Sequence, residues 1–324
     1  MTEFDYIKGS VEVAPGTYAW LYPDGGWGWN NPGLVVGQGA SLLIDTCFDL
    51  KTTQEMLDGF APLLVEAPLT TLFNTHANGD HYFGNQLIPE GIEIVATDAA
   101  KPDMTQEDVE AIESLKHLDG NVGAYARDIF GPFDFTSVKA VGPTRTFSGE
   151  VTLDIGGREV VLIELGPAHT PGDAVAWVPD AKVAFAGDIL FIGGTPIIWA
   201  GPVDNWIRAC DRLLDLEAEV YVPGHGPITD RNGVIGARDY LVFVKEAAES
   251  RFAAGMTVDE ATADIGAHLG RFAELGDGER LVQNVLNIYR SLHPEAETMP
   301  QLEVFRRMAE LDGYPILRSE EHPL

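Results

Sequence analysis

The first two thirds of the chain alternate between short apolar runs and turn residues. Runs rich in Val, Ile, Leu and aromatic residues end at Gly, Pro, Asn or Asp, a pattern typical of β-strands. The predicted strands span residues 18–22, 34–36, 41–44, 70–73, 92–96, 151–155, 160–164, 174–178, 183–186 and 219–222. Many of these runs are apolar on both faces, as in strands buried between other layers.

Helical patterns interrupt the strands and then replace them. Apolar residues three or four apart predict helices over 52–64, after Thr105 and over 206–216, the first of them beginning at a capping box, Thr52 to Glu55. From about residue 232 almost every segment is helical. Four helices are predicted there. The first spans 237–254, the second begins at a capping box over 257–260, the third spans 279–292, and the fourth begins at Pro300.

These patterns predict a core with helical additions. We expect a β-rich core over residues 1–231 and a helical C-terminal extension over 232–324 that packs on it. Residues 101–147 break the strand rhythm, so we expect an insertion there that forms a lid or a wall over a site.

Composition narrows the classes of partner. The chain has 45% hydrophobic and 22% charged residues, which favours a compact globular fold. Its formal charge of −29, without a basic patch, argues against nucleic acid and membrane surfaces as partners, and no apolar run is long enough to span a bilayer. The two cysteines give no disulfide framework, and Cys210 lies on an apolar helix stripe, so we expect it in the core. No secretory signal is visible, and a cytoplasmic location is expected.

Four predicted strands end in a sharp turn that carries His or Asp. The segments are 72–81, 161–172, 183–188 and 220–226, and together they hold four of the eight histidines. Strand ends in a layered sheet point to one rim, so these side chains are expected to converge. Imidazole and carboxylate groups are the ligands that zinc and similar divalent metals accept.

The order and spacing of these turns resemble the metallo-β-lactamase fold superfamily, whose first motif is typically His-x-His-x-Asp-His, followed by a lone His, a bridging Asp and a final His. The resemblance covers roughly residues 10 to 230. It implies an α+β fold, a four-layer αββα sandwich with the metal site at one edge, here with a C-terminal helical extension. It further implies two metal sites: His76 and His169 in the first, Asp80, His81 and His225 in the second, and Asp188 bridging them.

Asn78 departs from the family pattern, because it stands where the second His of the first motif usually lies. An amide oxygen can bind a metal but is a weaker donor to zinc than imidazole. We therefore expect one or two Zn²⁺ ions, with the first site weakened and Asn78 a candidate ligand. Iron and manganese stay open.

The resemblance also implies a hydrolytic mechanism. A divalent cation lowers the pKa of a bound water toward ~7 and polarises a carbonyl oxygen. By analogy with the family, Asp80 is the catalytic residue that orients the water and shuttles its proton. Asp45 ends a predicted strand and either supports a ligand histidine or caps a turn. Thr75 and Thr170 likewise either support a ligand histidine or cap a turn, and capping is the simpler explanation.

Aromatic residues near the motifs are candidates for substrate binding: Trp27, Trp29, Tyr82 and Trp199. The glycine-rich loop that carries Trp27 and Trp29 either contacts an apolar ligand or folds down onto the core. No Arg or Lys cluster lies near the motifs, which argues against nucleases and thioesterases of the glyoxalase II type.

The leading hypothesis is a metal-dependent hydrolase of a small neutral or aromatic ester, lactone, thioester or amide. Segments 23–27, 30–31, 74–76, 84–86 and 166–170 further resemble the aromatic polyketide cyclases of this fold, thought to act as thioesterases and cyclases. A persulfide dioxygenase and a non-catalytic binding protein of the same fold are further alternatives. The expected partner is a small-molecule substrate, and the sequence does not predict the oligomeric state.

Overall fold

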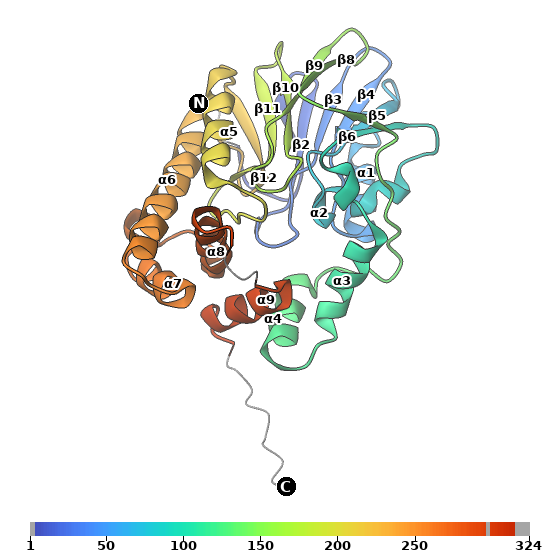
Figure 1. The fold of residues 1–324 in the computed structure, drawn as a ribbon. Coiled ribbons are helices and arrows are strands. Elements are labelled where there is room, and N and C mark those ends of the chain that lie inside the picture. The colour runs from blue at the N-terminus through green and yellow to red at the C-terminus, as the bar shows by residue number, and fades with distance from the viewer. Residues whose placement is uncertain (1–3, 296–298, 315–324) are drawn as a thin grey trace.

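The computed structural model describes residues 4–295 and 299–314. Residues 1–3 of the predicted core and residues 296–298 and 315–324 of the predicted extension lie outside the described residues. Two β-sheets lie face to face, with helices on both outer sides and a further group of helices beyond one edge of the sheets (Figure 1). The order of layers is helix, sheet, sheet, helix. This confirms the predicted αββα sandwich with a helical C-terminal region.

The first sheet, within the described residues, contains seven strands in spatial order: β1 (Gly9–Ala14), β2 (Thr17–Leu21), β3 (Gly33–Val36), β4 (Ser41–Ile44), β5 (Leu69–Phe73), β6 (Glu93–Thr97) and β7 (Arg145–Phe147). Strands β4 to β7 pair in parallel, so the carboxyl ends of β4 and β5 meet at the same edge. The sequence reading missed β1 and β7. Both are edge strands, and neither has the continuous apolar run on which strand prediction rests.

The second sheet contains five strands: β8 (Glu150–Asp154), β9 (Glu159–Glu164), β10 (Ala174–Val178), β11 (Val183–Phe191) and β12 (Val220–His225), with spatial order β12-β11-β10-β9-β8. Strand β11 is longer than the predicted 183–186. It continues because Gly187 and Phe191 still pair with β12, and all nine of its residues are buried. Asp188 therefore lies inside a strand rather than in a turn after it.

Alternation along the strands divides the core into layers. Leu42 and Ile44 of β4 face the space between the sheets, whereas Leu43 faces helix α1 (Leu50–Phe60) on the outer side. Helix α5 (Val203–Asp215) covers the outer face of the second sheet. Its Cys210 is completely buried there, as predicted from the apolar stripe.

Helix α6 (Arg231–Ala253) packs beside α5 and continues past the sheet. The helices beyond the sheet edge come from distant parts of the chain: α2 (Gly79–Tyr82), α3 (Gln106–Lys116), α4 (Gly120–Phe130), α7 (Val258–Gly266), α8 (Leu281–Leu292) and α9 (Gln301–Leu311). Helices α3, α4 and α9 lie together below the sheets in Figure 1. The ring of Phe130 on α4 lies 6.3 Å from that of Phe305 on α9. The 101–147 insertion thus meets the C-terminal helices. Across the described residues, no helix is both long enough and apolar enough to cross a membrane.

Several helix starts differ from the predictions; α5 begins at Val203 rather than 206, and α8 at Leu281 rather than 279. The box over 257–260 caps α7 as expected, but the predicted box at Thr52 is wrong, because α1 begins at Leu50. Asp49 is the N-cap: its Oδ1 accepts the backbone N–H of Thr52 at 2.8 Å. Helix α6 begins six residues before the predicted 237, where Asp230 caps it.

The cap assignment at Asp49 can be tested by stability. Asp49→Ala removes the cap and also leaves the backbone N–H of Asp134 without its acceptor, Asp49 Oδ2 at 3.0 Å. We expect the free energy of unfolding to fall by about 1–2 kcal/mol in urea denaturation. Glu55→Ala is the control, because among the described residues Glu55 makes only an exposed ion pair with Lys8, which contributes at most about 1 kcal/mol. A larger decrease in the free energy of unfolding for Glu55→Ala than for Asp49→Ala would indicate that Thr52, not Asp49, caps the helix.

Candidate metal centre

The predicted ligand side chains meet at one edge of the sandwich, where several strands end. Four buried imidazoles and two carboxylates come together there: His76 after β5, Asp80 and His81 in α2, His169 between β9 and β10, Asp188 in β11, and His225 at the end of β12. The parallel pairing of β11 with β12 brings the last two side by side. Their convergence was the expectation drawn from the strand-end turns.

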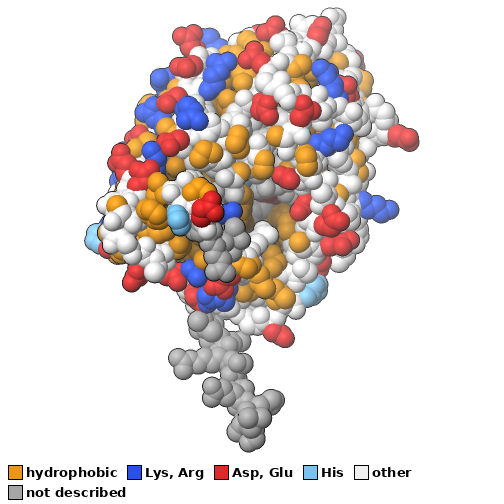
Figure 2. Space-filling view, viewed as in Figure 1, with side chains coloured by type: hydrophobic (Ala, Val, Ile, Leu, Met, Phe, Trp, Pro, Cys, Tyr) orange, Lys and Arg blue, Asp and Glu red, His pale blue; other side chains and the backbone are white. Residues whose placement is uncertain are grey.

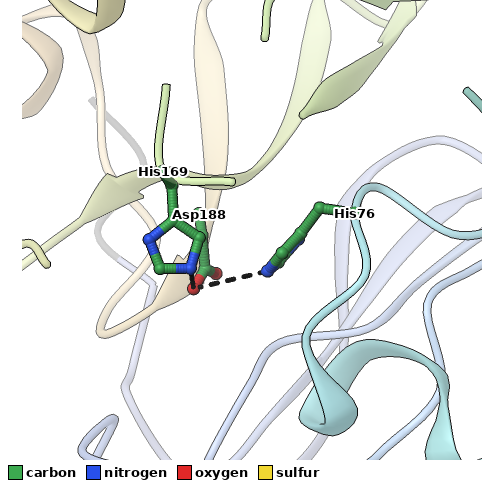
Figure 3. A group of neighbouring side chains, drawn as sticks. All are labelled: His76, His169 and Asp188. Atoms are coloured by element: carbon green, nitrogen blue, oxygen red, sulfur yellow. Dashed lines mark ion pairs between the residues drawn. The ribbon is translucent and has the colours of Figure 1, made fainter. Parts of the chain in front are cut away.

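One group consists of His76, His169 and Asp188 (Figure 3). Asp188 Oδ2 lies 3.7 Å from His76 Nε2 and 3.3 Å from His169 Nε2. Their ligand atoms all lie within 4.8 Å of one another, close enough to share one cation.

The second group consists of Asp80, His81 and His225. His225 Nε2 lies 3.2 Å from Asp80 Oδ2, and His81 Nε2 lies 3.8 Å from the same oxygen. Asp188 also reaches this group, at 3.1 Å from His81 and 3.4 Å from His225. It therefore stands between the two groups, where a bridging ligand would stand, and the individual ligand roles stay predictions.

The donor atoms fit a divalent cation. Within the described part of the chain, His76 Nε2, His81 Nε2 and Asp188 Oδ1 are buried and make no hydrogen bond. A buried polar atom without a partner costs about 1–3 kcal/mol, so three in one cluster are unusual unless they bind something. Imidazole nitrogens with carboxylate oxygens are the donor set of zinc and related metals.

The electrostatics of the cluster favour added positive charge. Burial, with the neighbouring His81, lowers the pKa of His76 well below its usual range, and burial also lowers the pKa of His169. Both imidazoles therefore stay neutral. Burial opposes charge on His81 and His225 as well, but the Asp188 carboxylate raises the pKa of His81 well above its usual range and that of His225 to about 9. Because protons and metal ions compete for these atoms, the same carboxylates attract either.

Asp45 orients two histidines of the cluster, His81 directly and His76 through Thr75. Its Oδ2 accepts a hydrogen bond from His81 Nδ1 at 2.8 Å and from the Thr75 hydroxyl at 2.8 Å, and its Oδ1 accepts the Thr75 backbone N–H at 2.7 Å. Thr75 in turn contacts His76 Nδ1 at 3.0 Å. The structure thus contains the supporting contact for which Asp45 was a candidate, and such contacts fix the orientation of ligand imidazoles.

Asn78 lies against the first group. Its Nδ2 is 2.8 Å from His169 Nε2, while His169 Nδ1 is 2.7 Å from the carbonyl oxygen of Ile197. Because a carbonyl only accepts, Nδ1 carries the proton and Nε2 offers its lone pair to the Asn78 amide. That lone pair is the one a cation would use. The placement supports the prediction that this group binds metal less tightly.

Asp173 was not singled out from the sequence, although it shapes the loop of His169. Its buried carboxylate accepts hydrogen bonds from the backbone N–H groups of Ala168 and Thr170 and from the Thr170 hydroxyl. Burial raises its pKa to about 7, although these hydrogen bonds act in the opposite direction. Thr170 therefore takes part in a turn, the simpler of its two alternatives.

A cavity of about 570 Å³ opens beside the His and Asp cluster, and Asp80, His169, Asp188 and His225 are among its lining residues. Figure 2 shows hydrophobic side chains gathered around a hollow on this face. Six Phe and Trp side chains are part of the lining, and we call four of them the aromatic wall: Trp27, Phe130, Trp199 and Phe305. Each ring lies 6.0–6.4 Å from at least two others. The volume is typical of small-molecule sites.

The predicted substrate-binding residues divide. Trp27 and Trp199 line the cavity. Tyr82 does not: it is completely buried, and its hydroxyl donates to the carbonyl of Thr105 at 3.2 Å, so the prediction was wrong for this residue. Trp29 packs on Tyr22 and Phe133, away from the lining. The glycine-rich loop therefore folds onto the core and presents one indole to the cavity.

Comparisons with known proteins agree with this geometry. A family model described as the metallo-beta-lactamase superfamily matches residues 25–225. A 2,4-dinitroanisole O-demethylase subunit alpha from a Nocardioides species is 26% identical over 198 residues, which cover 59% of this chain and 51% of the relative. A hydroxyacylglutathione hydrolase from Brucella ovis is 31% identical over 108 residues, 32% of this chain and 41% of the relative. The chain thus spans about half the length, or less, of these curated relatives.

One solved structure follows the chain beyond the family match. A stereoselective inverting sec-alkylsulfatase from a Pseudomonas species superposes with a TM-score of 0.67 at 19% identity, covering 95% of this chain and 55% of that one. At this identity the likeness concerns the fold alone. The helical C-terminal region therefore belongs to the shared architecture.

The two groups are expected to differ in metal affinity. After dialysis against Zn²⁺ and then against buffer, we expect elemental analysis to find about one tightly held ion in the wild type. His225→Ala should lose most of it. Asn78→His adds a third imidazole to the His76 group and should raise the content toward two ions, whereas Asn78→Ala should not. Equal metal content in Asn78→His and wild type would mean that Asn78 does not limit the first group.

Proposed function

Since this chain belongs to the metallo-beta-lactamase superfamily, whose model matches more than half of its residues, we propose that it is a metal-dependent hydrolase. Its substrate is an ester, lactone, thioester or amide with an uncharged aromatic or bulky apolar group. The observation that carries the proposal is the aromatic wall, which lines the same cavity as the His and Asp cluster. We further propose zinc as the metal, in one or two ions.

The residues have separate tasks in this mechanism. His76, His169 and Asp188 would hold one cation, and Asp80, His81, His225 and Asp188 the other. A bound divalent cation would supply a water of lowered pKa and polarise the substrate carbonyl. Asp80 lines the cavity with Oδ2 only 3.2 Å from His225, so this oxygen is placed to orient a water and to accept its proton.

The charges around the cavity support an uncharged substrate. Asp103 and Asp108 are among its lining residues. Among the described residues that line it, Arg280 is the one Lys or Arg, and it is paired with Asp277 at 3.2 Å. A polyanionic carrier such as coenzyme A or glutathione would therefore meet repulsion with little compensation.

The aromatic polyketide cyclase/thioesterase is the alternative, and the size and aromatic lining of the cavity favour it. A relative gives separate support for aromatic substrates. The Nocardioides protein is named for 2,4-dinitroanisole, which is itself an aromatic ether.

The proposed hydrolysis has a direct test. We expect the zinc-loaded wild type to hydrolyse 1-naphthyl acetate with a higher kcat/KM than acetyl-coenzyme A. Asp80→Asn keeps the shape but loses the proton acceptor, so kcat should fall about 100-fold or more, with the fold intact by circular dichroism. A wild type that retains zinc and hydrolyses none of a panel of esters, lactones, thioesters and amides would favour the binding-protein alternative.

The aromatic wall predicts a change in KM. Phe305→Ala removes one ring from the wall, and we expect KM for 1-naphthyl acetate to rise about three- to tenfold, since an aromatic contact contributes about 0.5–1.5 kcal/mol beyond area burial. The matched control is Phe252→Ala, because Phe252 packs on Tyr289 outside the cavity. An equal rise in KM for both variants would remove the wall from substrate binding.

A further inference from the structure

A single buried carboxylate connects three segments that are distant in the sequence. Glu279 lies in the 3-10 turn η4 (Gly278–Arg280), just before α8, and is 5% exposed. Its Oε1 accepts a hydrogen bond from Trp27 Nε1 at 2.8 Å and another from the Tyr125 hydroxyl at 2.8 Å. Trp27 belongs to the glycine-rich loop and Tyr125 to helix α4 of the insertion.

Neutral donors hold this carboxylate. Among the described residues, Glu279 forms no ion pair, because its neighbour Arg280 pairs with Asp277 and donates to the carbonyl of Thr195. A carboxylate buried without a cation depends on the hydrogen bonds it accepts. The hydrogen bonds that Glu279 accepts from Trp27 and Tyr125 therefore fix the orientation of both donor side chains.

Glu279 and Arg280 hold the Trp27 indole together. Glu279 fixes the edge of the ring through its N–H, and the Arg280 guanidinium lies 4.4 Å from the ring centroid. The indole meets Phe130 edge to face, with ring centroids 6.0 Å apart and planes at 86°. Two consecutive residues of η4 thus set the angle at which Trp27 faces the cavity.

The backbone of the loop that carries Trp27 is held by contacts that do not involve Glu279. Asn31 Nδ2 donates to the carbonyl oxygens of Pro223 at 3.0 Å and Gly226 at 2.8 Å, on either side of His225. Gly25, with φ +68°, packs so closely on Gly226 that a Cβ there would lie 2.7 Å from its nitrogen. Loss of Glu279 should therefore free the indole without releasing the loop.

We propose that Glu279 is a positioning residue that locks the Trp27 indole into the aromatic wall and thereby selects substrates with a flat aromatic group. This role rests on the proposed function. It assigns the preference for aromatic substrates to a carboxylate that need not touch the substrate. Without Glu279 the indole N–H loses its acceptor, and the ring is free to rotate away from its position in the aromatic wall.

The test compares Glu279→Leu with Glu279→Gln, which keeps an acceptor oxygen. The measured quantity is the ratio of kcat/KM for 1-naphthyl acetate to kcat/KM for ethyl acetate. We expect Glu279→Leu to lower this ratio about three- to tenfold, through KM for the naphthyl ester, and Glu279→Gln to stay within about twofold of wild type. Tyr125→Phe is the matched control: it removes the other donor to the same oxygen from a residue outside the cavity lining, so it should leave the ratio unchanged.

A double-mutant cycle keeps the test decisive if Glu279→Leu is unstable. Trp27→Phe removes the indole N–H, so adding Glu279→Gln or Glu279→Leu to it should lower the ratio no further. Equal losses in Glu279→Leu and Glu279→Gln, or additive losses in the double variants, would overturn the proposal.

A binding measurement separates this proposal from the proposed function. The neutral arene 4-nitrobenzyl alcohol should quench tryptophan fluorescence on binding, with Kd raised about three- to tenfold by Glu279→Leu and within about twofold of wild type in Glu279→Gln. If wild type hydrolyses no ester but this order of Kd values holds, hydrolysis fails while the positioning role stands. If esters are hydrolysed and Kd is the same in all variants, the positioning role fails alone.

Discussion

The Asp188 carboxylate is the constraint on which the rest of the site depends. It is 3% exposed and lies within 3.7 Å of four imidazole nitrogens. Burial raises the pKa of Asp188, but its neighbours, His225 and His81 above all, hold that pKa well below the usual range. A carboxylate buried to this extent is stable only with compensating charge, from protons or from metal ions. Each histidine must therefore be held at its place, and the surrounding structure does so. Asp45 illustrates the cost, because it adopts a left-handed backbone conformation, φ 61°, at the end of β4 while its carboxylate orients His81 and Thr75.

The sequence predicted this cluster better than it predicted the surrounding elements, for a physical reason. Most residues of the cluster lie at or just after the ends of strongly apolar strands, and strand ends at one edge of a sheet converge whatever the loops do, so local patterns suffice. Strands β1 and β7 lack such patterns because only one residue of each is buried. The start of α1 was misplaced because Thr52 and Glu55 have the spacing of a capping box, while Asp49, three residues earlier, makes the actual cap.

The aromatic wall could not be found in the same way. Its members come from the loop after β2, helix α4, the segment after β11 and helix α9, and no local pattern relates them. The misplacement of Tyr82 has the same origin: a position next to two ligand residues suggests the cavity, but in α2 it directs the ring into the core. Nearness in sequence to a ligand thus predicts the ligand cluster and not the cavity lining, which depends on how the insertion and the C-terminal helices pack.

This difference separates two levels of specificity in the molecule. The family match ends at residue 225, at the last histidine of the His and Asp cluster, so the matched region contains the whole cluster. Part of the cavity lining lies outside that limit, since Arg280 and Phe305 follow it in sequence, and another part, including Phe130, comes from the insertion within it. The chain has a formal charge of −29, and Arg280, the one Lys or Arg among the described lining residues, is already paired with Asp277, so these segments supply aromatic surface rather than anion-binding charge. Attraction of an aromatic substrate to such a wall comes from burial and ring contacts, which salt does not screen, so selectivity here depends on where the rings are held more than on long-range electrostatics.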